Sequence, residues 1–386
     1  MENETNEPIS ERSRRWAATM EGYEGSADDV TVAHRDSQAS IDVADGPAGV
    51  AGTLREREEQ IDALLAGGAT RGHGAGNRAR QEEPDEFRTC FERDRDRILH
   101  SSAFRRLAGK TQVFVFPDDH MRTRLTHALE VAQVATGVAR AVGLNVALTE
   151  AIALGHDCGH GPGGHASEEA LDPFVLGGFD HATWGADVSL VSLNLCVETL
   201  DGIRNHSWSR PAPSTPEGEV VSWADRIAYS CHDFEDAVSA AIVKAEDLPP
   251  VVAERCGTRR SQQLGSFINA MINTIRTTGV IGMDARHSEA LAAFRTFNYE
   301  SIYLRGASRQ QAAAVVSMLR ALVEYFAQHP WLIPDVADAR SDVESESAAM
   351  RLSVAYVAGM TDRFACRSAL TLLDWPVDQL PSGIDR

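Results

Sequence analysis

Residues 122–142 read RTRLTHALEVAQVATGVARAV, and this stretch decides the fold. Its apolar residues recur every three or four positions, at 125, 128, 129, 132, 135, 138, 139 and 142. A spacing near 3.6 predicts an amphipathic α-helix, and Gly143 is the residue type that ends one. A second helix is predicted to begin at Asn145 or Thr149 and to run to His156. The two helices would lie antiparallel across a tight turn.

The rest of the chain favours helices as well. The β-type runs at 113–116 and 219–221 are too short to build a sheet. Residues 205–219 contain three prolines and are predicted to form a loop, whereas 260–330 have the pattern of further helices. The sequence therefore predicts an all-α protein built as a helical bundle.

Helix geometry brings two histidines of this bundle together. His127 lies 16 positions before Gly143, and His156 lies 13 positions after it. At a rise of 1.5 Å per residue these are roughly 24 Å and 20 Å, so the two side chains come level to within about one turn. Asp157 follows directly, and Asp225 lies in a later helical stretch. The four can surround one divalent metal ion.

Taken singly, each of these residues is more often an ordinary core or surface residue than a ligand. Together they form the pattern H…HD…D, and eight of the 13 histidines fall between His120 and His232. Imidazole and carboxylate ligands suit Mn, Mg, Fe, Ni, Co or Zn better than a structural cysteine-rich zinc site would. We therefore expect a divalent metal ion of undetermined identity.

Composition and net charge limit the kinds of partner that we expect this protein to bind. The formal net charge of −19 argues against broad nucleic-acid binding. A local basic stretch beside the proposed metal site, from Arg93 to Lys110, is either a solvated helix face or a sign of a compact anionic substrate. No apolar run is long enough to cross a bilayer. Six scattered cysteines without a C-x-x-C pair favour reduced thiols, and hence a cytoplasmic protein without membrane contact.

The chain is predicted to have two parts. Residues 1–85 are acidic and contain a glycine-rich run at 67–76, which predicts a flexible, disordered extension. Within it, residues 53–66 could form one short helix. Residues 86–386 are predicted to form the folded domain, with additional helices in its C-terminal part.

Several motifs resemble a known family. The four residues match the metal-binding pattern of the HD superfamily of phosphohydrolases. The surrounding sequence resembles the deoxyguanosine triphosphate triphosphohydrolase (dGTPase) family in six segments: 95–114, 122–131, 155–160, 164–171, 225–233 and 356–364. The resemblance covers roughly residues 86–370. It implies an HD-domain helical bundle that cleaves deoxynucleoside triphosphates (dNTPs) to deoxynucleoside and triphosphate.

The resemblance also implies roles for single residues. The implied metal ligands are His127, His156, Asp157 and Asp225. The implied catalytic residues are His165, Glu168 and His160. The implied substrate contacts are Arg124, Gln112, Lys110, His181, Tyr229 and Asp233. Family members assemble into oligomers and bind regulatory nucleotides between subunits, so the resemblance implies a homo-oligomer and a regulatory nucleotide here.

Two alternatives stay open at this point. An HD phosphodiesterase or nucleotidase acting on monophosphates or cyclic nucleotides would need the same four ligands. A nucleotide-binding regulator without hydrolysis would keep the pocket but not the chemistry; His165 and Glu168 argue against it. The sequence does not determine the preferred base.

Overall fold

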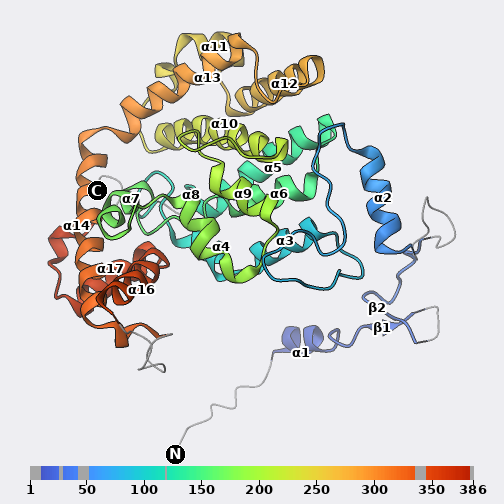
Figure 1. Cartoon of the computed structure of the whole chain (residues 1–386), viewed down its shortest axis with the longest axis horizontal. Coiled ribbons are helices and arrows are strands. Elements are labelled where there is room, and N and C mark those ends of the chain that lie inside the picture. The colour runs from blue at the N-terminus through green and yellow to red at the C-terminus, as the bar shows by residue number, and fades with distance from the viewer. Residues whose placement is uncertain (1–9, 26–28, 42–51, 118–119, 335–344, 383–386) are drawn as a thin grey trace, which may run out of the picture. The chain divides into compact units, whose positions relative to one another are not determined.

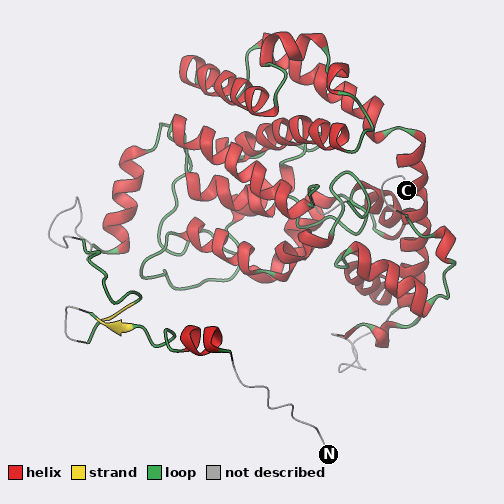
Figure 2. Ribbon diagram, turned by 180° about the vertical axis from the view of Figure 1, so that it is seen from behind, coloured by secondary structure: helices red, strands yellow, loops and turns green. Residues whose placement is uncertain are grey.

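The computed structural model describes residues 10–25, 29–41, 52–117, 120–334 and 345–382. The chain divides into two compact units, Met1–Gly52 and Thr53–Arg386. The first contains helix α1 (Glu11–Ala17) and a two-stranded antiparallel hairpin of β1 (Tyr23–Glu24) and β2 (Thr31–Val32). Helix α1 buries none of its residues. Figure 2 shows no strand in the described part of the second unit.

The second unit is helical, which confirms the predicted all-α class. Its α-helices in chain order are α2 (Leu54–Leu64), α3 (Cys90–His100), α4 (Ser102–Arg106), α5 (Arg124–Val142), α6 (Val146–Gly155), α7 (His165–Leu171), α8 (His181–Trp184), α9 (Val197–Asn205), α10 (Pro216–Ser239), α11 (Pro250–Cys256), α12 (Arg260–Thr278), α13 (Ala285–Asn298), α14 (Gly306–Gln328), α16 (Glu346–Ala358) and α17 (Asp362–Leu372). A π-helical turn, η6 (Tyr299–Tyr303), joins α13 to the loop before α14. None of the described helices is both long and apolar enough for a membrane span.

Helices α5 and α6 form the predicted antiparallel pair. Gly143 ends α5 with φ +75°, a left-handed conformation that glycine adopts without steric cost. Asn145 caps α6, where its side chain accepts from the amide of Leu148. Helix α3 packs on α6, and α10 packs on both α5 and α6 (Figure 1). This packing brings the start of α5, the end of α6 and the middle of α10 to one place.

The buried side chains form two cores. The larger one contains the apolar faces of α3, α5, α6 and α10, including Ile98, Leu148 and Ile227, which are fully buried. The smaller one joins α7 and α14 with α16 and α17 through residues such as Leu319 and Val357. Removal of these surfaces from water is the main driving force for the packing. In the loop that leads into α7, Gly163 lies directly against Val315 of the smaller core.

Residues 53–85 belong to the compact second unit, which differs from the extension predicted for 1–85. Thr70 donates its backbone amide and hydroxyl to Glu217 at 3.0 and 2.6 Å. Arg78 forms a 2.6 Å ion pair with Asp94, and both side chains are almost fully buried. The glycine-rich composition of this stretch predicts flexibility. Composition alone does not reveal the polar contacts that the stretch makes with residues far away in the sequence.

Candidate metal centre and adjoining cavity

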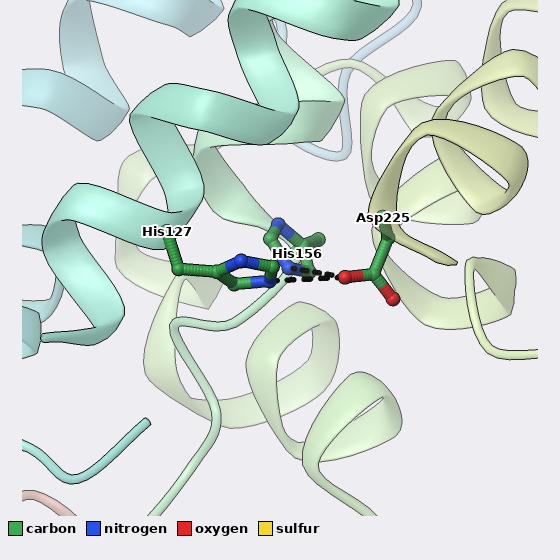
Figure 3. Close-up of side chains that lie close together, drawn as sticks. All are labelled: His127, His156 and Asp225. Atoms are coloured by element: carbon green, nitrogen blue, oxygen red, sulfur yellow. Dashed lines mark hydrogen bonds and ion pairs between the residues drawn. The ribbon is translucent and has the colours of Figure 1, made fainter. Parts of the chain in front are cut away.

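The four predicted metal ligands come together from three helices. His127 lies on the first turn of α5, His156 and Asp157 follow the last turn of α6, and Asp225 lies in the middle of α10. The Nε2 atom of His127 is 3.0 Å from Oδ1 of Asp225, and Nε2 of His156 is 3.7 Å from the same oxygen (Figure 3). Oδ2 of Asp157 lies 3.5 Å from His156 Nε2 and 3.9 Å from His127 Nε2. Four ligand atoms therefore face one point.

Hydrogen bonding around His156 fits a cation at that point. Its Nδ1 donates to the carbonyl of Ala153 at 2.7 Å, so the hydrogen is on Nδ1 and Nε2 carries a lone pair. This Nε2 is buried and has no hydrogen-bond partner among the described residues. The oxygens nearest to it belong to Asp157 and Asp225, which have lone pairs of their own. A divalent ion would satisfy all of these atoms at once.

Both carboxylates of the cluster are held ionised. Burial alone raises the pKa of Asp157, but Arg124, which donates to it at 2.8 Å, and the neighbouring His156 and His160 bring that pKa well below its usual value. Burial likewise raises the pKa of Asp225, but the hydrogen bond with His127 and the nearby His156 and His206 together outweigh it and leave the pKa at about 2. An ionised, buried carboxylate is the form that binds a metal.

Arg124 faces the cavity with unused donors. Its side chain is 2% exposed, and Nη1 is occupied by Asp157. Its Nε and Nη2 are buried and have no partner among the described residues. Two guanidinium nitrogens without a partner in this geometry suit the oxygens of an anion.

A second set of side chains surrounds Glu168. Its Oε2 accepts from His165 Nδ1 at 3.1 Å and its Oε1 from His181 Nδ1 at 2.6 Å. Burial raises the pKa of Glu168, but these two hydrogen bonds bring it far below its usual value. His160 stacks on His181 with ring centroids 3.7 Å apart. The side chain of His165 is largely exposed, whereas those of His160 and His181 are buried.

Glycine 159 permits this close approach. A Cβ atom at this position would lie 1.9 Å from the carbonyl oxygen of His181. Any larger residue would therefore separate the segment of His160 from the start of α8. The glycine-rich run of the sequence thus has a packing role beside the site.

A cavity of about 540 Å³ opens over both sets of residues. Nearly all of the predicted substrate contacts and catalytic residues line it: Gln112, Arg124, His160, His165, Glu168, His181, Tyr229 and Asp233. His127, Asp157 and Asp225 also reach its surface, and His156 lies behind them.

Lys110 is the exception among the predicted substrate contacts. Its ammonium group is buried away from the cavity and donates to the carbonyls of His160 and Ala358, the latter at 2.9 Å. Burial lowers the pKa of Lys110 to about 8. Because both contacts are within the fold, Lys110 joins the loop before α7 to the end of α16 instead of reaching a ligand.

The positive charge of the cavity comes from arginines that the sequence did not single out. The guanidinium groups lining it, besides Arg124, are those of Arg226, Arg295 and Arg305. Arg226 lies 3.4 Å above the ring of Trp208. By contrast, Arg93 and Arg97 of the predicted basic stretch pair with Glu82, and their side chains are only 13% and 27% exposed. These two arginines therefore hold the chain before α3 in place and do not line the cavity.

Two aromatic residues of the cavity were also missed. Tyr303 donates its hydroxyl to Asp233, and His206 lies with its Nε2 3.3 Å from Nε2 of His181. His206 belongs to the histidine-dense region, which was the one signal for it. Tyr303 is 70 positions from Asp233, and no sequence motif connects the two.

Comparison with known proteins identifies the relatives of this chain. Residues 124–230 match the HD domain, and residues 281–369 match the phosphohydrolase-associated domain. A deoxyguanosinetriphosphate triphosphohydrolase-like protein of Caldanaerobacter subterraneus subsp. tengcongensis is 40% identical over 320 residues, which cover 81% of this chain and 93% of the relative. Proteins of the same description are 40% identical in Clostridium perfringens, over 74% of this chain and 87% of the relative, and 33% identical in Geobacter metallireducens, over 82% and 96%.

Proposed function

Because this chain belongs to the family of deoxyguanosinetriphosphate triphosphohydrolase-like proteins, we propose that it is a metal-dependent dNTP triphosphohydrolase. Its reaction is the hydrolysis of a dNTP to a deoxynucleoside and intact triphosphate. The observation that carries this function is the buried cluster of His127, His156, Asp157 and Asp225 beneath a cavity lined by four arginines.

The four clustered residues would hold the metal ion. When bound, the ion polarises a phosphate oxygen and lowers the pKa of a coordinated water. The unpartnered Nε2 of His156 supports this assignment, as do the two ionised carboxylates. The identity of the metal is open among Mn, Mg, Fe, Ni, Co and Zn.

The arginines favour a polyphosphate over a monophosphate or a cyclic phosphate. Arg124 holds Asp157 with Nη1 and has Nε and Nη2 left for a phosphate group. Arg226, Arg295 and Arg305 add three further positive charges to the cavity wall. A triphosphate carries enough negative charge to use several of these groups, whereas a single phosphate does not.

His165 is the proposed general acid. Its Nδ1 is hydrogen-bonded to Glu168, which stabilises the protonated ring and orients it. In the reaction, the oxygen of a water molecule bonds to the α-phosphorus and the bond from that phosphorus to the 5′ oxygen breaks. His165 supplies a proton to the leaving 5′ oxygen. His160 contacts Asp157 at 3.2 Å and His181 contacts Glu168 at 2.6 Å, so each histidine holds one of the two carboxylates in place.

The sugar is proposed to contact Gln112, Tyr229 and Asp233. The Oε1 atom of Gln112 is buried and has no partner among the described residues, so it can accept from a sugar hydroxyl. Tyr229 accepts from Arg295 at 3.0 Å, which leaves its own hydroxyl hydrogen free to donate. Asp233 is fixed by Tyr303 and Arg122.

We also propose a cytoplasmic homo-oligomer that binds a regulatory nucleotide. The family resemblance supports the oligomer and the nucleotide. The six cysteines, all free and buried, support a reducing compartment. Sedimentation of the purified protein with and without each dNTP would test the assembly.

The test of the reaction is a product assay with Mn²⁺ and each of the four dNTPs. We expect tripolyphosphate and deoxynucleoside in equal amounts. Asp157→Asn should lower kcat at least 1000-fold with its helical circular dichroism retained, whereas Asp187→Asn, an exposed acid on the surface, should leave kcat unchanged. Release of orthophosphate or pyrophosphate alone would contradict the proposed reaction.

A further inference from the structure

Trp208 and Arg226 form a stacked pair in the wall of the cavity. Both residues line it, and the guanidinium carbon of Arg226 lies 3.4 Å from the centre of the Trp208 ring. A tilted guanidinium would bring one of its nitrogens closer still to the ring, inside van der Waals contact. The group therefore lies flat on the indole, where a cation and an aromatic face attract each other.

Trp208 is itself held by helix α10. Its Nε1 donates to the carbonyl oxygen of Ser222 at 3.1 Å, and its ring meets that of Trp223 edge to face with centroids 4.7 Å apart. Ser222 and Arg226 are four positions apart in α10 and hence share one face of the helix. The indole therefore spans one turn of α10, with its hydrogen bond at one end and Arg226 at the other.

A flat guanidinium keeps its donors available. Stacking uses the face of the group, whereas its N–H bonds point outward in the plane, where they suit phosphate oxygens. An arginine that is already fixed by stacking also loses less rotamer freedom when it binds a ligand. Trp208 is 46% exposed, so packing of the hydrophobic core does not account for its place in the loop before α10.

A second cation makes this support necessary for Arg226. Arg295 lines the same cavity, where its Nε donates to the hydroxyl of Tyr229. Burial lowers the pKa of Arg226, and the charge of Arg295 adds to this effect. Two like charges repel each other while no anion lies between them. The ring of Trp208 offsets this repulsion and keeps Arg226 from turning away from Arg295.

We propose that Trp208 is a positioning residue for polyphosphate binding, whose ring holds the guanidinium of Arg226 in place before the substrate enters the cavity. This role rests on the proposed function, because it presupposes a polyphosphate in the cavity. Trp208 acts through Arg226 and not on the reacting atoms. Its loss should therefore weaken binding and leave the chemical step nearly unchanged.

Binding of inorganic tripolyphosphate tests this role. The purified protein is titrated with tripolyphosphate in excess Mg²⁺, and the affinity is measured by calorimetry. Trp208→Leu keeps an apolar side chain without the aromatic face and should weaken binding roughly 5–30-fold. Trp208→Phe keeps an aromatic face and should recover part of this loss. With a dNTP as substrate, KM should rise in Trp208→Leu by a similar factor, while kcat changes little.

Two further measurements connect the effect to Arg226. Arg226→Gln removes the cation, and in that background Trp208→Leu should cause no further loss of tripolyphosphate affinity. The tryptophan fluorescence of the unchanged protein should change on binding, and Trp208→Phe should abolish this change. Trp331→Phe is the matched control, because Trp331 is 55% exposed and does not line the cavity. This variant should keep both the affinity and the fluorescence change.

The outcomes distinguish this role from the proposed function. If the unchanged protein releases tripolyphosphate from a dNTP but Trp208→Leu binds tripolyphosphate equally tightly, the role of Trp208 is overturned and the function stands. Equal losses from Trp208→Leu with and without Arg226 would also overturn the role, because Trp208 would then contact the ligand directly.

If the unchanged protein neither binds tripolyphosphate nor releases it from a dNTP, the proposed function fails together with the role of Trp208. Circular dichroism reports the fold of each variant. If Trp208→Leu loses its helical signal, Trp208→Phe decides, and an affinity equal to that of the unchanged protein would overturn the role.

Discussion

At the residue scale, the charge of Arg122 supports the part of the cavity where Asp233 is proposed to contact the sugar. Its guanidinium contacts three carboxylates, with Asp236 at 2.8 Å, Glu130 at 3.4 Å and Asp233 closest. The side chain is 8% exposed, so these charges interact with little solvent screening. Asp233 in turn accepts from Tyr303. Arg122 therefore determines where two cavity residues lie.

Replacement of Arg122 by Met should cost about 3–5 kcal/mol of unfolding free energy at pH 8, because the buried Asp233 and the half-buried Asp236 and Glu130 lose their partner. Burial already raises the pKa of Glu130 and of Asp236 despite Arg122. A carboxyl whose folded pKa is raised stabilises the fold at low pH, and this contribution is lost as pH rises. The loss should therefore be smaller at pH 5 than at pH 8 in urea unfolding. Arg140→Met, at an exposed position of α5, is the control, and an equal loss at both pH values would contradict this explanation.

The contribution of Lys110 to stability also increases with pH, in this case because a buried base loses its proton. Its pKa in the fold is about 8 because of burial, against 10.5 for a free lysine. Between these values the unfolded chain binds the extra proton, so the contribution of Lys110 to stability rises with pH. The unfolding free energy of the unchanged protein minus that of Lys110→Met should grow by roughly 2–3 kcal/mol from pH 8 to pH 10.

The comparison with Lys110→Met is needed because buried cysteines titrate in the same range. Lys244→Met, which removes the only other lysine from an exposed position, should show no such growth. If the difference in unfolding free energy between the unchanged protein and Lys110→Met stays constant with pH, Lys110 has the same charge in the folded and unfolded states.

The sequence predicted the metal cluster better than the rest of the cavity. Helix periodicity and one glycine place His127 level with His156, and Asp157 follows by adjacency. Lys110 was misplaced because a motif does not tell whether a side chain turns toward a pocket or toward backbone carbonyls. Arg295 and Tyr303 were missed because they reach the cavity through the packing of α13 against α10 and through η6, which follows α13; such tertiary packing leaves no local sequence pattern.

At the scale of elements, α5 has one glycine inside it and another directly after its last residue, and their replacement is expected to have opposite effects. Gly143 ends the helix with φ +75°, and a Cβ there would lie 3.2 Å from the backbone nitrogen of Ala66. Gly143→Ala should cost about 1–2 kcal/mol, because an L-residue is strained in the left-handed region. Gly137 lies inside the helix with no atom within 4 Å of a built Cβ, so Gly137→Ala should stabilise by about 0.5–1 kcal/mol.

Thermal unfolding of both alanine variants measures this difference. If Gly143→Ala is as stable as the unchanged protein, the turn between α5 and α6 does not require the left-handed conformation. The counting of helical residues that aligns His127 with His156 assumes a turn fixed at Gly143, and this assumption would then be wrong. The metal affinity of Gly143→Ala is the second measurement.

Boundaries of elements were predictable only where a local residue sets them. Gly143 and Asn145 gave the turn between α5 and α6. The loop predicted for 205–219 spans only residues 206–215, because Asn205 still belongs to α9 and Pro216 already occupies the first turn of α10. Proline is compatible with that position because the first amides of a helix have no intrahelical partner.

At the scale of the whole molecule, the chain is expected to tolerate loss of residues 1–52 but not of residues 1–85. Contacts divide it between Gly52 and Thr53. Residues beyond that point supply Arg78 to the buried Asp94 and Thr70 to Glu217, which is itself fully buried. Glycine-rich composition could not reveal this, because the partners lie up to 147 positions away.

A chain of residues 53–386 should therefore unfold at the same urea midpoint as the full chain and keep its metal affinity. A chain of residues 86–386 leaves Asp94 and Glu217 buried without these partners, which costs about 3–5 kcal/mol for each broken buried contact of an ion. That sum is comparable to the total stability of a typical domain, so we expect a loosely packed or unfolded product. The full-length variant Arg78→Met should show part of the loss. A native-like midpoint for 86–386 would instead place the start of the folded domain where composition alone had predicted it.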